Sequence, residues 1–245
     1  MMLRSFAAAA IVLAATMSGP CMASDQRLLV LDGSWVKWGA PKWGAGATVT
    51  YGFADAAVRS PTARNCASLV AFDELARRTG LAGPRLRAEA EAAFAAWSQV
   101  TGLAFVEAPV AARADILIGA QGKPTGWAFT NIELESGPQA QAPATERGLA
   151  ETPEQATPAA AHSIRSIRHA SICLNPLAKW KIGFDGNLRT YDVRYTLMHE
   201  IGHAIGLDHP GAAGALMGFR YDEKLTGPTR SDGEAARALY GPHVK

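Results

Sequence analysis

Three histidines lie within eleven residues of this chain, in the run HEIGHAIGLDH over 199–209. His199 and His203 are four residues apart, so on a helix both imidazoles project from one face, one turn apart. That spacing suits two corners of a tetrahedral zinc site. Gly206 follows His203 by three residues, where a helix end commonly needs a positive φ, and a sharp turn there would bring back His209 as a third ligand. Three protein ligands leave one position open, as in a catalytic zinc site.

Glu200 adjoins the first of these histidines and is not needed as a ligand itself. Zinc lowers the pKa of a bound water to about 7, so a nearby carboxylate can accept the proton of that water. The same carboxylate can then pass the proton to a leaving amine. The motif therefore predicts hydrolysis of an amide bond, with Glu200 as the general base and acid.

The long motif resembles that of the metzincin metallopeptidases, and the residues around it narrow the resemblance to the matrixins. Met217 follows His209 by eight residues in the run GALM. This is similar to the matrixin Met-turn, in which the methionine lies beneath the zinc and is not a ligand. Pro210 and Gly211 are instead more similar to serralysins. The resemblance covers roughly residues 34–242, with insertions at 56–84 and 131–168.

The resemblance implies an α+β fold of the metzincin, or zincin-like, type. We expect a twisted, mostly parallel sheet, an active-site helix, a Met-turn and a C-terminal helix around a shallow cleft. Phe219 and Tyr221 would form the wall of the pocket for the residue just after the scissile bond, with Tyr195 near its mouth. Phe219 stands where matrixins usually carry proline. Tyr221 follows Met217 by four residues, whereas the zinc-contacting tyrosine of astacins and serralysins follows by two, so we do not expect it to bind zinc.

The elements that must position these residues follow from apolar periodicity and turn residues. Helices are predicted at 62–79, 85–100, 190–206 and 231–240, the last with Ser231 as its N-cap. In the helix at 85–100 the apolar residues fall on one face, namely Leu86, Ala90, Ala93, Phe94 and Trp97. Strands are predicted at 47–54, 103–107, 114–120, 126–130 and 169–175. The three tryptophans at 35, 38 and 43 lie in a segment interpreted as a linker. Residues 134–162 contain almost no large apolar side chains and predict a flexible insertion.

The first residues predict export. Arg4 is the only charged residue before Asp25, an uncharged apolar run covers 6–17, and small residues lead to Ala23. This order is typical of a secretory signal peptide. We expect residues 1–23 to be removed and 24–245 to form a single catalytic domain, secreted or periplasmic.

Cys66 and Cys173 remain after that cleavage, and an even pair in an oxidising compartment favours a disulfide. Two separate buried thiols are the alternative. Enzymes of this family are often kept latent by a propeptide cysteine, but Cys66 lies in Arg-Asn-Cys-Ala rather than Pro-Arg-Cys-Gly. We therefore expect activity to arise on folding and zinc binding, or to be controlled by a separate proteinaceous inhibitor.

Other metal sites have weaker support in the sequence. Asp185, Gly186 and Asn187 would suit a calcium loop, but the same residues are typical of a plain turn, so no calcium site is assigned. His162 and His169 lie near the position of the matrixin structural zinc, whose ligand segment has no counterpart here. Single histidines at such places are more often surface or strand residues, so one catalytic zinc is the expected cofactor.

The composition excludes several classes of protein. The 245 residues are 48% hydrophobic and carry a net charge of +2, too small an excess for electrostatic binding of nucleic acid. No apolar run reaches the roughly 20 residues of a membrane-spanning helix. We expect a monomeric, secreted zinc-dependent endopeptidase that acts on protein or peptide substrates. The alternatives are an exported zinc hydrolase acting on cell-wall peptides and a non-catalytic zinc-binding protein of the same fold.

Overall fold

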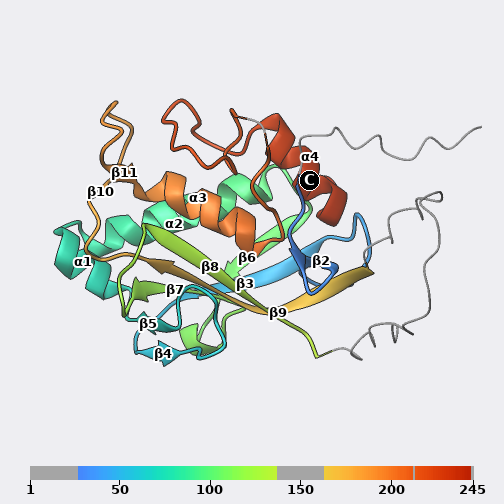
Figure 1. Ribbon diagram of the computed structural model, residues 1–245, viewed down its shortest axis with the longest axis horizontal. Coiled ribbons are helices and arrows are strands. Elements are labelled where there is room, and N and C mark those ends of the chain that lie inside the picture. The colour runs from blue at the N-terminus through green and yellow to red at the C-terminus, as the bar shows by residue number, and fades with distance from the viewer. Residues whose placement is uncertain (1–26, 137–162, 212, 244–245) are drawn as a thin grey trace, which may run out of the picture.

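The computed structural model describes residues 27–136, 163–211 and 213–243 (Figure 1). The predicted signal peptide and most of the predicted insertion at 134–162 lie outside these residues. The strands are β1 (Val30–Leu31), β2 (Ser34–Lys37), β3 (Ala47–Phe53), β4 (Val58–Arg59), β5 (Ser68–Val70), β6 (Leu103–Glu107), β7 (Ile116–Gln121), β8 (Ala128–Leu134), β9 (Ser163–Leu174), β10 (Trp180–Lys181) and β11 (Tyr191–Asp192). The helices are α1 (Asp73–Thr79), α2 (Gly83–Ser98), α3 (Val193–Ala204) and α4 (Arg230–Tyr240).

The main sheet is mostly parallel, which confirms the expected α+β fold. Its order is β1-β2-β9-β7-β3-β6, and every neighbouring pair from β2 to β6 is parallel. β8 runs antiparallel to β9, from Ala128 opposite Leu174 to Leu134 opposite Ile167. Among the described strands β8 pairs with β9 alone, so its other edge is open.

Two helices, α2 and α3, lie side by side over one face of this sheet (Figure 1). The buried face of α2 is the one that the apolar periodicity predicts, and it includes Leu86, Phe94 and Trp97. The indole Nε1 of Trp97 donates a hydrogen bond to the Met198 carbonyl of α3 over 2.8 Å. The core therefore fixes α3, the helix that carries the histidine motif, against both α2 and the sheet.

None of the described helices is long and apolar enough to cross a membrane.

A buried lysine fixes the chain that follows β2. Lys37 has no exposed surface, and its Nζ donates to the carbonyl oxygens of Trp38, Ala40 and Ala45 over 2.8–3.0 Å. Burial lowers the pKa of Lys37 to about 8. Three carbonyl partners offset part of the cost of burying this ammonium group, and the lowered pKa reflects the part that they do not offset.

Three local predictions are wrong. The predicted helix at 62–79 is helical only in α1, because Leu69 and Val70 of β5 pair with the last two residues of β7. The predicted linker contains β1 and β2, and β2 joins the sheet beside β9. The N-cap of α4 is Thr229 and not Ser231, since Thr229 forms a capping box with Asp232.

Candidate metal centre

The helix α3 begins and ends with the local signals expected of its sequence. Asp192 caps its N-terminus, where a carboxylate oxygen accepts from the backbone N–H of Tyr195 over 2.8 Å. At the other end Gly206 has a φ of +94°, and a Cβ there would overlap the Val36 carbonyl oxygen. The N–H groups of Gly206 and Leu207 donate to the carbonyls of His203 and Gly202, both over 2.9 Å. This Schellman turn is the sharp turn predicted after the second histidine.

Segments distant in the sequence hold the end of α3. The indole Nε1 of Trp38 donates to the Ala204 carbonyl, and the Tyr240 hydroxyl donates to the Ile205 carbonyl, each over 2.8 Å. The last carbonyls of a helix have no partner within the helix. Two buried side chains, one following β2 and one from α4, therefore complete the helix end and fix its exit turn.

The turn brings the three predicted ligands together. One ring nitrogen from each of His199, His203 and His209 lies within 4.8 Å of the others, and the Nε2 atoms of His199 and His209 are 3.2 Å apart. Tetrahedral zinc with Zn–N bonds of about 2.0–2.1 Å places its ligand atoms about 3.3 Å apart. The donor set therefore fits zinc. In the part of the chain that the structure describes, no other group of three or more potential ligands was found.

Backbone carbonyls orient two of the imidazoles. Nδ1 of His199 donates to the Leu216 carbonyl over 2.8 Å, and Nδ1 of His203 donates to the Leu207 carbonyl over 2.9 Å. Each bond selects the tautomer whose Nε2 has a free lone pair for a metal. Burial, together with the neighbouring imidazoles, lowers the pKa values of His203 and His209 to about 4, so both rings are neutral ligands at pH 7.

The turn that contains Met217 lies under α3 and is fixed by α4. Met217 is buried, and its sulfur lies so close to Gly202 that a Cβ at that position would overlap it. The N–H groups of Leu216 and Met217 donate to the Asp232 carboxylate over 2.9 and 3.3 Å. Because the Leu216 carbonyl holds His199, the first helical turn of α4 indirectly positions a zinc ligand.

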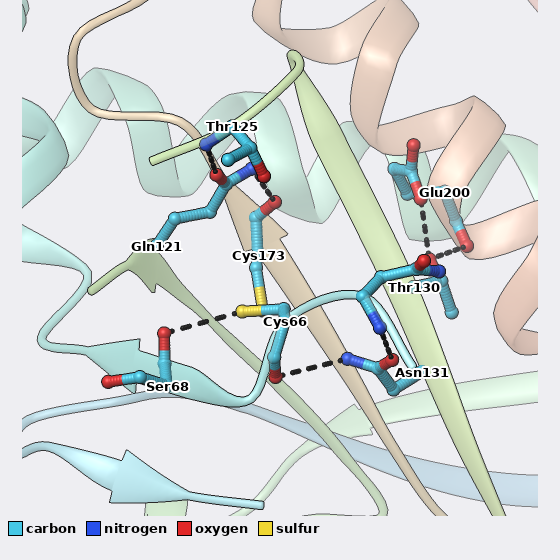
Figure 2. Close-up of a disulfide and its surroundings, with 9 residues drawn as sticks. Cys66, Ser68, Gln121, Thr125, Thr130, Asn131, Cys173 and Glu200 are labelled. Carbon is cyan, nitrogen blue, oxygen red and sulfur yellow. Dashed lines mark hydrogen bonds between the residues drawn. A yellow bond between two sulfur atoms is a disulfide. The ribbon is translucent and has the colours of Figure 1, made fainter. Parts of the chain in front are cut away.

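Glu200 lies beside the triad and is buried, with 7% of its surface exposed. The hydroxyl of Thr130 on β8 lies 2.7 Å from the carboxylate oxygen Oε2 and 2.9 Å from the backbone carbonyl of Glu200 (Figure 2). Burial raises the pKa of Glu200, although His199 and the Thr130 hydrogen bond act in the opposite direction. Sequence reasoning missed Thr130, because one threonine in a predicted strand carries no recognisable signal.

The motif opens onto a cavity of about 860 Å³ that follows β8 and includes the triad and Glu200. The predicted pocket residues Tyr195, Phe219 and Tyr221 all line it. Tyr221 stacks on Tyr191 at 4.6 Å between ring centroids, and Tyr195 meets Tyr221 edge-on at 4.7 Å. Phe219 is 81% exposed and stacks on the ligand His209 at 3.9 Å.

The Tyr221 hydroxyl is engaged in two hydrogen bonds within the protein. It donates to Glu223 Oε1 over 2.8 Å and accepts from the backbone N–H of Asp192 over 3.0 Å. Burial and the Glu223 carboxylate raise the pKa of Tyr221. The hydroxyl therefore ties the pocket wall to the N-terminus of α3.

Cys66 and Cys173 form a disulfide across 107 residues (Figure 2). The segment just before Cys66 lines the cavity. The side chain of Asn131 on β8 accepts from the backbone N–H of Asn65 and donates to the Cys66 carbonyl, both over 3.3 Å. The disulfide and this side chain together fix the segment at 62–66 to β9 and β8.

Within the described residues, the other candidate metal ligands do not assemble into a second cluster. Asp185, from the candidate calcium loop, pairs with the Lys181 ammonium, which also pairs with Glu223. His169 lies opposite Glu133 in the β8–β9 ladder, and burial lowers its pKa. His162 lies outside the described residues.

Three convergent imidazoles on a helix and its exit turn, next to an open strand edge, define the catalytic domain of a zinc peptidase. The family comparison is more specific. The matrixin family model matches residues 70–241, well over half of the chain, so the chain belongs to the matrixin family of zinc metalloendopeptidases. No curated protein matches the chain significantly.

Proposed function

We propose that this protein is an exported endopeptidase that hydrolyses peptide bonds in proteins, with Glu200 as the general base and acid. One observation carries the proposal: a buried carboxylate lies beside a convergent histidine triad and lines an open cavity. Residues 24–245 would form one monomeric catalytic domain. The N-terminal sequence pattern and the disulfide both favour an oxidising compartment outside the cytoplasm.

His199, His203 and His209 would hold the zinc ion, as their donor atoms fit it. When bound, zinc supplies a Lewis acid that polarises the scissile carbonyl and acidifies the attacking water. Glu200 accepts a proton from that water as it attacks the carbonyl carbon, and then delivers the proton to the amine that leaves. Burial makes the carboxylate a better proton acceptor, because it disfavours the charged form.

The cavity favours an extended polypeptide as substrate. The open edge of β8 offers backbone groups that can pair with an extended chain. Beyond the triad, Tyr195, Tyr221 and the exposed ring of Phe219 form an apolar wall where a substrate side chain would lie. These residues are the proposed pocket for the residue that follows the scissile bond.

The test is a digest of a proteome-derived peptide library by the purified protein, with and without a zinc chelator. We expect cleavage that disappears with the chelator, returns with added zinc, and is absent for Glu200→Gln. Chelator-resistant cleavage would contradict the zinc mechanism. Cleavage of purified cell-wall material but of no library peptide would favour the cell-wall hydrolase, and bound zinc with no turnover on either would favour the non-catalytic protein.

A further inference from the structure

Thr130 is the third residue of β8, opposite Ile172 of β9, and its side chain points to the middle of α3 (Figure 2). Its Oγ1 lies 2.7 Å from Glu200 Oε2 and 2.9 Å from the Glu200 carbonyl oxygen. Both acceptors belong to the same residue, so the hydroxyl joins the open-edged strand directly to the carboxylate beside the histidine triad. The second oxygen, Oε1, has no hydrogen bond to a described residue and is left for the reaction.

We propose that Thr130 is a positioning residue that holds the Glu200 carboxylate in its working orientation. The inference rests on the proposed function, in which Glu200 moves the proton. A glutamate has three rotatable side-chain bonds, and freezing them before reaction removes an entropic cost from the catalytic step. One short hydrogen bond to a fixed strand achieves this at the end of the side chain.

The Thr130 hydroxyl lies between two acceptors, and this position suits Glu200 in both its ionised and its protonated form. A hydroxyl group can donate one hydrogen bond while it accepts others. When Glu200 is ionised, Thr130 donates to Oε2. When Glu200 carries the proton of the attacking water on Oε1, Oε2 is still an acceptor, so the Thr130 hydroxyl can stay in place and donate either to Oε2 or to the Glu200 carbonyl. The same heavy-atom geometry therefore serves Glu200 before and after it accepts the proton.

The backbone around Thr130 is fixed on both sides. Phe129 pairs with Cys173, the β9 residue whose sulfur is bonded to Cys66. Asn131 holds the backbone at Cys66 through its side chain. Thr130 thus lies between two residues that are attached to the disulfide-linked segment. A positioning residue needs a rigid support of this kind, because its hydroxyl can hold the carboxylate in place only if its own backbone is fixed.

The experiment compares Thr130→Val, which removes the hydroxyl at nearly constant shape, with Thr130→Ser, which keeps it. The control is Thr101→Val, since the Thr101 hydroxyl also makes two bonds, to Trp97 and Leu103, but lies away from the cavity. We expect Thr130→Val to lower kcat about 10- to 100-fold, a part of the 10²–10⁴-fold effect of general acid–base catalysis. KM and zinc content should stay within about threefold of wild type, and Thr130→Ser should restore most of kcat.

A wild-type kcat for Thr130→Val would overturn the inference, as would a loss of kcat that tracks lost zinc or that serine does not rescue. If the valine variant does not fold, Thr130→Ala is measured against Thr130→Ser in the same way. Glu200→Gln distinguishes a failure of the role of Thr130 from a failure of the proposed function. An inactive Glu200→Gln beside a fully active Thr130→Val contradicts only the role of Thr130, whereas an active Glu200→Gln contradicts the proposed function itself.

Discussion

Gly202 lies between the first two histidines of the motif, at the point where α3 packs on Met217. A Cβ at Gly202 would overlap the Met217 sulfur and lie 2.9 Å from its terminal methyl and 3.0 Å from Cζ2 of Trp97. Met217 is 2% exposed and Trp97 is fully buried, so neither side chain can move into solvent. We therefore expect Gly202→Ala to displace Met217, which packs against α3 at this point.

Two effects of known size compete in this variant. Replacing glycine by alanine inside a helix stabilises the fold by about 1 kcal/mol, whereas inserting a methyl group into a packed core costs about 1–3 kcal/mol. Gly202→Ala alone should therefore leave stability unchanged or lower it by up to about 2 kcal/mol. Met217→Ala alone should cost about 2–5 kcal/mol, but it opens the space that the new methyl group needs. In that background the same Gly202→Ala should stabilise by about 1 kcal/mol.

The assay is urea unfolding of the four proteins of this double-mutant cycle, in chelator so that zinc affinity does not contribute. Gly233→Ala is the control, because the nearest atom to a Cβ there, at 3.0 Å, is at the end of the long Arg237 side chain, which can shift by a few tenths of an ångström, so this variant should stabilise α4. A coupling energy of about 1–3 kcal/mol between positions 202 and 217 supports the packing argument. The reasoning is refuted if Gly202→Ala stabilises the wild type as much as it stabilises Met217→Ala.

Three further variants test other parts of the structure. Replacing both Cys66 and Cys173 by serine should lower the free energy of unfolding by about 3–5 kcal/mol, since the disulfide closes a loop of 107 residues. A denaturant midpoint equal to that of the wild type would contradict this. Lys37→Met should cost about 2–4 kcal/mol, because one buried and two part-buried carbonyl contacts lose the ammonium partner. Stability equal to or above that of the wild type would show that these carbonyls do not need it. Phe219→Ala should change the free energy of unfolding by no more than about 0.5 kcal/mol and lower kcat/KM for peptides about tenfold. Val106→Ala, at an exposed position of β6, is the control and should change neither quantity. An unchanged kcat/KM for Phe219→Ala would show that Phe219 is not part of the pocket.

The zinc site could be predicted from the sequence because its information is local. The spacing of His199 and His203 places them on one helical face, and the glycine at 206 determines the exit turn that brings back His209. The periodicity of α2 is local in the same way, and its buried face was predicted correctly.

The parts that could not be predicted depend on contacts between distant residues. Leu69 and Phe72 have helical spacing, but Leu69 pairs with Gln121 of β7, and this pairing replaces the first half of the predicted helix. Thr130 and Glu200 are 70 residues apart and meet only when β8 lies beside α3. The strands predicted at 126–130 and 169–175 are longer in the structure, because β8 pairs with β9 as far as Leu134 and the first residues of β9 pair with β2.

The central claim is that the His199, His203 and His209 triad binds zinc and that Glu200 performs the proton transfer. The most direct measurement is the zinc content of purified wild type and Glu200→Gln, taken together with their cleavage of unstructured casein. The account predicts one zinc per chain in both proteins, with cleavage abolished only in the variant, since glutamine keeps the shape of the side chain but cannot accept the proton. Full cleavage by Glu200→Gln at equal zinc content would contradict it.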